Sequence, residues 1–269
     1  LANTNNLGVT GGSYQNAYRS FFGRIMYNYK GRYYAQLNAR GDASSRFHKD
    51  YRWGFFPSAS VGWVISNESF MQNVTPVSYL KLRGSLGSLG NERIGNYPYQ
   101  SSINFNKAIM YDSNGSNIIS QMTGAQINYA VRDITWETTY SWDIGLDATL
   151  FDNRLNVTAD YYFKKTRDML LAAEIPTFTG FEAPDQNVGT MHTRGWEVSI
   201  GWKNKIGDFS YSVNANLSDY KSVMGDLRGK MVFYSDGTII KEGEEYRAWY
   251  GYKSQGLWQT APTGGDAVI

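Results

Sequence analysis

The chain has no cysteine, and only two histidines and six prolines occur among its 269 residues. The lack of cysteine is compatible with an extracytoplasmic protein that folds without disulfides. No stretch approaches the roughly 18 consecutive apolar residues of a membrane-spanning helix, which excludes a helical membrane protein. The formal net charge is only +2 and no basic run with interleaved aromatics occurs, so the sequence gives no indication of nucleic-acid binding.

Aromatic residues, by contrast, are abundant. They make up 16% of the chain, with 21 tyrosines and 8 tryptophans, and they favour β-strands and membrane interfaces. The mean hydropathy is −0.46. This value does not exclude a transmembrane β-barrel, because barrel strands carry their apolar side chains only at every second position.

Apolar and polar residues alternate in segment after segment. Between residues 33 and 42, for example, Tyr33, Ala35 and Leu37 alternate with Gln36 and Asn38. Successive side chains of a strand point to opposite faces, so each segment has one apolar and one polar face. A tilted strand needs about 10 residues to cross a bilayer. The alternating segments are residues 21–30, 33–42, 55–65, 80–86, 140–150, 155–164, 196–202 and 209–218, and a ninth begins near Trp249.

The connections fall into two length classes that alternate along the chain. Short links cover residues 30–32, 66–78, 151–154 and 203–208, and long links cover 41–52, 87–135, 165–192 and 219–245. Bacterial β-barrels have tight turns on one side of the membrane and large loops on the other. A soluble β-sandwich also alternates, but it rarely sorts its links in this way. The tryptophans near segment ends are typical of interfacial girdles: Trp63, Trp142, Trp196 and Trp202.

We therefore predict an all-β fold, an antiparallel transmembrane β-barrel segment of about 8–9 strands. Its strands are expected to form an open arc whose first and last members do not pair. The side chains predicted to face lipid are Leu37, Val61, Leu82, Leu146, Val157, Val198 and Val213. Those predicted to face inward are Gln36, Ser60, Arg83, Asp147, Thr158, Glu197 and Asn214.

Residues 20–30 (SFFGRIMYNYK) resemble a stretch of the form FGRxNYxYK, and residues 52–58 (RWGFFPS) with Gly62-Trp63 resemble RWGxFPSxSxGW. Both are motifs of SusC/RagA-type TonB-dependent outer-membrane transporters, which this sequence resembles. Further matches, in the order of that family, are 80–91 (LKLRGSLGSLGN), 136–138 (WET) with 145–147 (GLD), 187–197 (NVGTMHTRGWE), and 249–258 (WYGYKSQGLW). In the penultimate stretch His192-Thr193 replaces the residues usual in the family, and in the last Ser254-Gln255 does so.

The resemblance implies that residues 1–269 are a partial TonB-dependent receptor β-barrel domain, without the N-terminal plug and the final strands of a 22-stranded barrel. It also implies import of oligosaccharides or oligopeptides across the outer membrane of a Gram-negative bacterium. The expected partners are TonB, acting through the absent N-terminal region, and a SusD-like surface lipoprotein. A passive porin is the alternative. No enzyme activity, cofactor or metal is expected, and His48 and His192, both placed in long loops, lack zinc-ligand spacing.

Candidate ligand-binding residues are aromatic side chains of the long loops, because sugar rings and peptide side chains stack on such surfaces. The candidates are Tyr97, Tyr99, Tyr111, Phe178 and Phe181. The alternative is that large loops pack cores of their own. Charged residues predicted to line the lumen could contact cargo or plug, or simply form salt bridges between neighbouring strands. They are Arg24, Lys30, Arg40, Lys81, Arg83, Asp143, Asp147 and Asp160.

Overall fold

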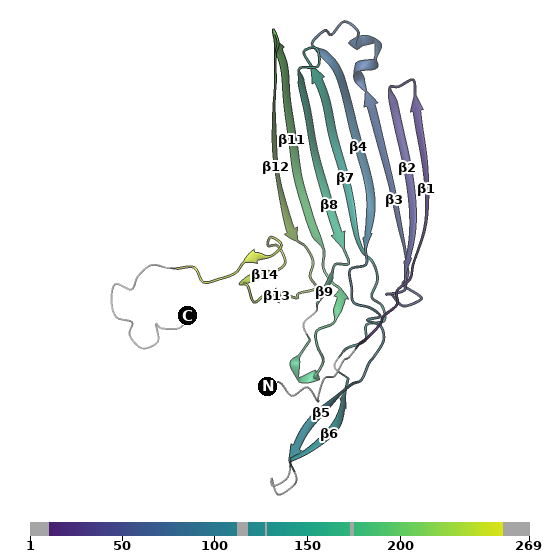
Figure 1. Ribbon diagram of the computed structural model, residues 1–269, viewed down its shortest axis with the longest axis vertical. Helices are drawn as coiled ribbons and strands as arrows, with labels where there is room; N and C mark the ends of the chain where they lie inside the picture. Colours follow the sequence, from purple (N-terminus) through teal and green to yellow (C-terminus); the bar gives the residue numbers. More distant parts are fainter. Residues whose placement is uncertain (1–10, 112–117, 127, 173–174, 255–269) are drawn as a thin grey trace, which may run out of the picture.

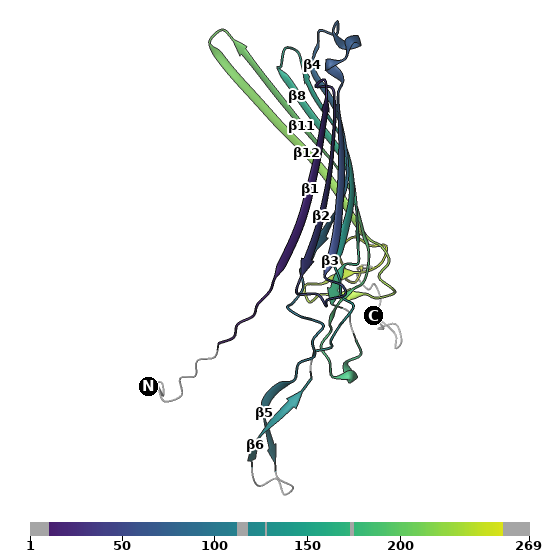
Figure 2. The same ribbon diagram turned by 90° about the vertical axis from the view of Figure 1, so that its right-hand side faces the viewer.

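The computed structural model describes residues 11–111, 118–126, 128–172 and 175–254. Its main feature is a curved, antiparallel eight-stranded sheet with the order β1-β2-β3-β4-β7-β8-β11-β12 (Figures 1 and 2). The strands are β1 (Tyr18–Tyr29), β2 (Tyr33–Ser44), β3 (Trp53–Val64), β4 (Val77–Asn91), β7 (Glu137–Leu150), β8 (Leu155–Arg167), β11 (Met191–Ile206) and β12 (Phe209–Met224). Among the described strands β1 pairs only with β2, and β12 pairs only with β11, apart from a single bridge between Val223 and Glu245 at the loop end. The prediction of an open all-β arc is thus confirmed.

The two faces of this sheet differ as the alternation predicts. Five of the residues predicted to face lipid are exposed, and Val157 and Val198 are half-buried. In a sandwich these side chains would share one buried core. Instead most of the buried hydrophobic residues form clusters at one end of the sheet. We call the face that carries the exposed set the apolar face, and the opposite face, which carries Arg83, Asp147 and Asp160, the polar face.

Short connections gather at one end of the sheet, the turn end. The β3–β4 connection contains two short 3-10 helices, η2 (Ile65–Asn67) and η3 (Ser69–Met71), with Glu68 between them. The carboxylate of Glu68 accepts hydrogen bonds from the Tyr33 hydroxyl (2.7 Å) and the Trp63 indole (3.1 Å), and pairs with Arg32 (3.2 Å). Glu68 therefore ties the β1–β2 turn to the β3–β4 turn. These partners lower the pKa of Glu68, the Tyr33 hydrogen bond most.

Long connections gather at the opposite end, the loop end, and contain small sheets. The hairpin of β5 (Asn104–Tyr111) and β6 (Ile118–Ala125) projects farthest from the main sheet (Figures 1 and 2). A second pair joins β9 (Leu170–Ala172) to β10 (Asp185–Asn187), with η4 (Thr177–Thr179) between them in the chain. A three-stranded sheet is made of β13 (Val232–Phe233), β14 (Thr238–Ile240) and β15 (Ala248–Trp249).

At this end the strands are longer than predicted: β2, β4, β8 and β12 continue into the predicted long links, to Ser44, Asn91, Arg167 and Met224. Two further expectations are wrong. The strand near Trp249 is β15, which has two residues and pairs with β14 rather than with the main sheet. His192 was placed in a long loop but lies in β11, opposite Lys165 of β8, with its ring 5.9 Å from that of Phe163. The strand begins earlier than predicted because its pairing with β8 and β12 continues beyond the segment with clear alternation.

Candidate functional site

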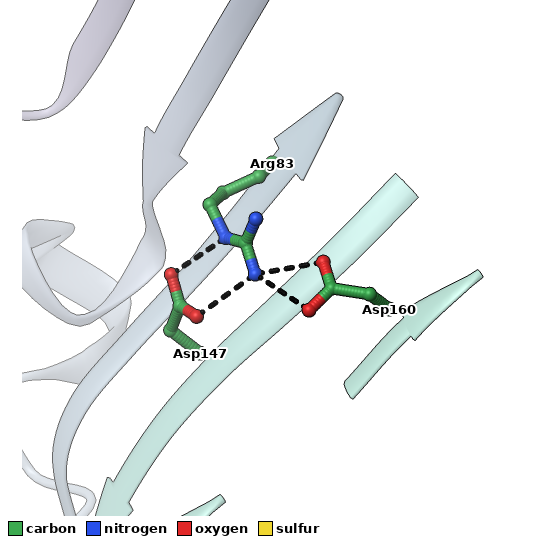
Figure 3. Close-up of polar contacts among 3 residues, drawn as sticks. All are labelled: Arg83, Asp147 and Asp160. Carbon is green, nitrogen blue, oxygen red and sulfur yellow. Dashed lines mark hydrogen bonds and ion pairs between the residues drawn. The ribbon is translucent and has the colours of Figure 1, made fainter. Parts of the chain in front are cut away.

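The polar face carries an ion-paired cluster that spans three strands. Arg83 of β4 donates to Asp147 of β7 through Nε (2.8 Å) and Nη2 (3.1 Å), and to both oxygens of Asp160 of β8 through Nη2 (2.8 and 3.1 Å) (Figure 3). All three side chains are partly exposed, at 30%, 29% and 21%. Charge-assisted, two-pronged contacts of this kind are strong and hold a guanidinium in a defined orientation.

Gly145 makes possible the contact between Arg83 and Asp160, which crosses the intervening strand β7. It lies on β7 between Arg83 and Asp160, opposite each of them in the strand register. A Cβ atom at Gly145 would lie only 2.7 Å from Arg83 Cζ and would also clash with Asp160. Because glycine lacks that atom, the guanidinium lies over the β7 backbone.

A shallow hollow of about 710 Å³ lies beside this cluster, over β1 to β4. A polar ladder crosses it, in which Arg24 donates to Asn38 (2.8 Å) and Asn38 donates to Ser58 (3.0 Å). Beyond Ser58 the row continues with Gly87 and Ser141. The serines, amides and arginine of this wall offer hydrogen bonds to a hydrated ligand, and Phe22, Phe56 and Leu89 also line the hollow.

The loop end is built on a buried aromatic core. Trp136 packs against Phe47, Phe56 and Tyr18, with ring centroids 5.3, 5.5 and 6.1 Å away, and donates its indole N–H to Arg52 O (2.8 Å). Further members of the cluster are Ile94, Val131 and Ile134, with Leu170 packed against it. Residues of three long connections therefore share one core, which gives the loops a fixed arrangement.

Asn187 joins two of these connections through its side-chain amide. It accepts from Thr135 N (2.7 Å) and donates to Thr135 O and Asp168 O (both 2.9 Å). Nearby, Glu137 accepts from Leu170 N (3.0 Å). Backbone groups that would otherwise be unpaired are thus satisfied by side chains.

The small sheet of β13, β14 and β15 has an electrostatic support of its own. Asp236 accepts from the Thr238 hydroxyl (2.7 Å) and pairs with Arg247 (2.5 Å), and Arg247 also lies over the Tyr234 ring at 4.5 Å. The Thr238 hydrogen bond and the Arg247 charge lower the pKa of Asp236. Trp249, Tyr250 and Tyr252 remain exposed on this sheet and the residues after it.

The predicted loop aromatics do not form a single group. Tyr97 and Tyr99 lie together, half-buried, with an edge-to-face contact at 6.1 Å, and Tyr99 meets His48 at 5.5 Å. Phe181 packs instead on Tyr129 at 5.6 Å, whereas Phe178 in η4 is 89% exposed. Tyr111 ends β5, and its side chain lies outside the described part of the structure.

The predicted lumen charges occupy the polar face with one exception. Lys30 lies in the β1–β2 turn, over the ring of Tyr29 at 5.2 Å, and not on the wall. Arg40 pairs with Asp42, which is on its own strand (2.7 Å). Sequence reasoning missed Asn187, Glu68 and Trp136 as organising residues, since each acts through contacts with distant segments. It also missed the exposed aromatics around Trp249.

Among the described residues no helix is long and apolar enough to cross a membrane. In that same part of the chain no group of three or more His, Asp or Glu side chains is arranged to hold a metal ion.

A family model described as TonB dependent receptor-like, beta-barrel, matches residues 2–265. The chain belongs to this family. As a TonB-dependent receptor barrel of the outer membrane it falls among receptors rather than enzymes. The loop end then corresponds to the outside of the cell and the turn end to the periplasm.

Curated relatives support the assignment. The chain is 37% identical over 257 residues to TonB-dependent receptor P39 of Formosa agariphila, covering 94% of this chain and 24% of that protein. It is 35% identical over 207 residues to TonB-dependent receptor SusC of Bacteroides thetaiotaomicron, covering 76% of this chain and 20% of SusC. The chain thus spans about a quarter or less of the length of these relatives.

Solved structures of the RagAB peptide importer share the fold. The closed–closed state matches with a TM-score of 0.76 at 30% identity, over 85% of this chain and 25% of the importer chain. The open–open state matches with a TM-score of 0.74 at the same identity. The SusC/RagA-type resemblance found in the motifs is therefore confirmed.

Proposed function

We propose that the full-length protein imports large nutrients, oligosaccharides or oligopeptides, across the outer membrane in a TonB-dependent manner. The observation that carries this proposal is the curved sheet with one polar and one apolar face, in a chain of the TonB-dependent receptor family. The hydrogen-bonding wall around Asn38 and Ser58 suits a hydrated cargo. The likeness to SusC and to the RagAB peptide importer supports this class of cargo.

The domain organisation that follows is a barrel of about 22 strands, of which this chain supplies a part. A lumen of that width is too large for side chains to fill and would leak unless plugged. A plug has to be displaced by work, and the outer membrane has neither nucleotide nor ion gradient to supply it. Energy delivered from TonB through an N-terminal plug region satisfies this requirement.

A SusD-like surface lipoprotein is the partner proposed for the loop end. The long loops all emerge at one end of the sheet, and the Trp136 core holds three of them in a fixed arrangement. Such a platform suits a protein that caps the barrel. Tyr97 and Tyr99, which lie together on it, are the candidate residues for contact with cargo.

Growth on the cargo as sole nutrient tests the proposal, in strains with and without TonB. Deleting TonB should abolish growth at low cargo concentration while the barrel remains folded in the outer membrane. Purification from native membranes should also recover a surface lipoprotein. If growth at low cargo concentration persists without TonB, the protein is a passive pore instead.

A further inference from the structure

Charged side chains on the apolar face are confined to the loop end of the sheet. The strand register fixes which residues share that face. Along the middle and the turn end of the described strands, this face carries no charged residue. At the loop end it carries Arg19, Lys165, Arg167, Arg194, Asp219 and Lys221. Charge on the lipid-facing side is therefore limited to one membrane interface and is mainly positive.

Three of these residues form a contiguous group, which we call the basic patch: Lys165, Arg167 and Arg194. Lys165 of β8 lies opposite His192 of β11, and Arg194 lies two residues further along β11. Arg167 lies two residues beyond Lys165, with its guanidinium 5.3 Å from the centre of the Tyr140 ring. Lys165 and Arg194 are diagonal neighbours, about 7–8 Å apart. The guanidinium of Arg167 lies over Tyr140, the residue of β7 opposite Lys165, so one ligand centred on Lys165 can reach all three.

The basic patch is accessible and free of carboxylate partners. Arg167 and Arg194 are exposed and Lys165 is half-buried. None of the three forms an ion pair with any residue that the structure describes. The neighbouring Lys221 is already paired with Glu245 (2.8 Å). Asp219, the single acid on this face of the described strands, lies opposite Trp196 and is a diagonal neighbour of Arg194, but it forms no ion pair with it.

Aromatic rings lie directly beneath the basic patch on the same face. Trp142 contacts Phe163 at 6.1 Å and Tyr161 at 5.8 Å, and Trp196 lies opposite Tyr161. Belts of this kind mark the level of the lipid headgroups. The basic patch therefore sits at the headgroups of the outer leaflet.

We propose that Lys165, Arg167 and Arg194 bind the phosphate groups of a phosphorylated glycolipid of the outer leaflet. Arginine presents a planar fork that matches phosphate geometry, and lysine adds a point charge. The apolar strands below the patch offer a surface to the acyl chains of the same molecule. This continuity favours a lipid over a free anion or a protein partner. The site requires only the outer-membrane location and is independent of what the barrel transports.

Native mass spectrometry of the full-length protein, purified in detergent and titrated with lipid A, tests the site. The triple variant Lys165→Gln, Arg167→Gln and Arg194→Gln should bind lipid A on the order of 100-fold more weakly than the wild type, given the usual contribution of each basic residue near an anionic membrane surface. Dephosphorylated lipid A should bind the wild type as weakly as lipid A binds the variant. Inorganic phosphate at millimolar concentration should not displace the lipid.

The matched control is Lys164→Gln, Lys203→Gln and Lys205→Gln, which removes the same charge from the polar face of β8 and β11. This control should bind lipid A like the wild type, and heat-modifiable mobility on gels should show that both variants are folded. Equal binding by the wild type and the patch variant would overturn the proposal, as would equal weakening in the control. Displacement of lipid A by inorganic phosphate would overturn the proposal, because it would show that the patch binds anions without recognising the lipid. Loss of the surface lipoprotein with lipid binding intact would assign the patch to a protein partner.

Discussion

Arg83 of β4 is paired with Asp160 of β8 (2.8 Å), although the whole of β7 lies between their strands. The contact exists because Gly145, at the crossing point on β7, has no side chain. Asp147 on β7 holds the other side of the same guanidinium. Three strands are thus linked by one side chain in addition to their backbone hydrogen bonds.

Replacing Gly145 with alanine should separate Arg83 from Asp160. The added methyl group would lie 2.7 Å from Arg83 Cζ, and overpacking of this kind costs about 1–3 kcal/mol. Denaturant unfolding of the full-length protein in detergent measures the loss. The control is Gly23→Ala on β1, where an added Cβ meets nothing within 4 Å. Equal stability of the two variants would show that the crossing contact does not contribute.

The loop platform should depend on Trp136. Its side chain is 5% exposed and forms the centre of the aromatic core, and Trp→Ala changes in cores cost about 3–5 kcal/mol. Trp136→Ala should therefore open the loops to protease on intact cells while the membrane-embedded strands stay protected. Trp249→Ala, which removes a side chain that is 84% exposed, should leave the cleavage rate unchanged. Wild-type resistance in Trp136→Ala would contradict a shared loop core.

The turn end should weaken in acid through Glu68. Its pKa is lower in the folded protein than the ordinary 4.5, chiefly because of the Tyr33 hydrogen bond. The stabilisation is therefore complete above that ordinary pKa and is lost as the pH falls through the lower folded-state pKa. Melting curves should show that Glu68→Gln lowers the Tm at neutral pH and that the difference from wild type shrinks in acid. The exposed Glu242→Gln serves as control. A difference in Tm between Glu68→Gln and wild type that does not change with pH would show that the ionised Glu68 carboxylate does not stabilise the turn end.

Cargo affinity should fall when Tyr97 and Tyr99 are both changed to alanine. If each ring stacks on the ligand, the loss is about 0.5–1.5 kcal/mol per ring, or on the order of tenfold in Kd for the pair. Calorimetry on the full-length protein, together with the proposed lipoprotein, measures this. Phe70→Ala is the matched control, since Phe70 is an exposed aromatic (64%) of the turn end. Unchanged affinity in the double variant would leave the two tyrosines with a purely structural role in the loop.

The main sheet was predictable from sequence because one face of each strand meets lipid and the other meets water. That asymmetry imposes a period of two, which identifies the strands and assigns Leu37 and Gln36 to opposite faces. The same signal fades where a strand leaves the membrane. Met191–His192 of β11 were therefore assigned to a loop, and β5 and β6 were hidden within the long 87–135 connection.

The candidate sites were predictable only in part. The alternation along each strand predicts which charged residues lie on the polar face. It does not predict that Arg83 pairs with Asp160, because that contact skips a strand and depends on a glycine between the two side chains. Asn187 bridges backbone groups 52 residues away in the chain, and no local pattern indicates such a partner. The basic patch was not predictable, because Lys165 and Arg167 fall in the 165–192 connection and Arg194 precedes the predicted segment 196–202. The alternation assigns them to the apolar face only because β8 and β11 extend that far.

Each strand of the main sheet pairs with the next main-sheet strand along the chain. This order affects both the assembly of the barrel and its evolution. Such a wall can grow one hairpin at a time, without any strand having to thread between two others. Each intermediate, however, ends in an edge such as that of β12, which along its membrane-embedded part offers backbone groups that lipid cannot satisfy. Insertion therefore requires a catalyst that forms backbone hydrogen bonds with the exposed edge strand until the barrel closes. Duplication of a hairpin in the gene would widen the pore by two strands and leave every existing contact between neighbours intact.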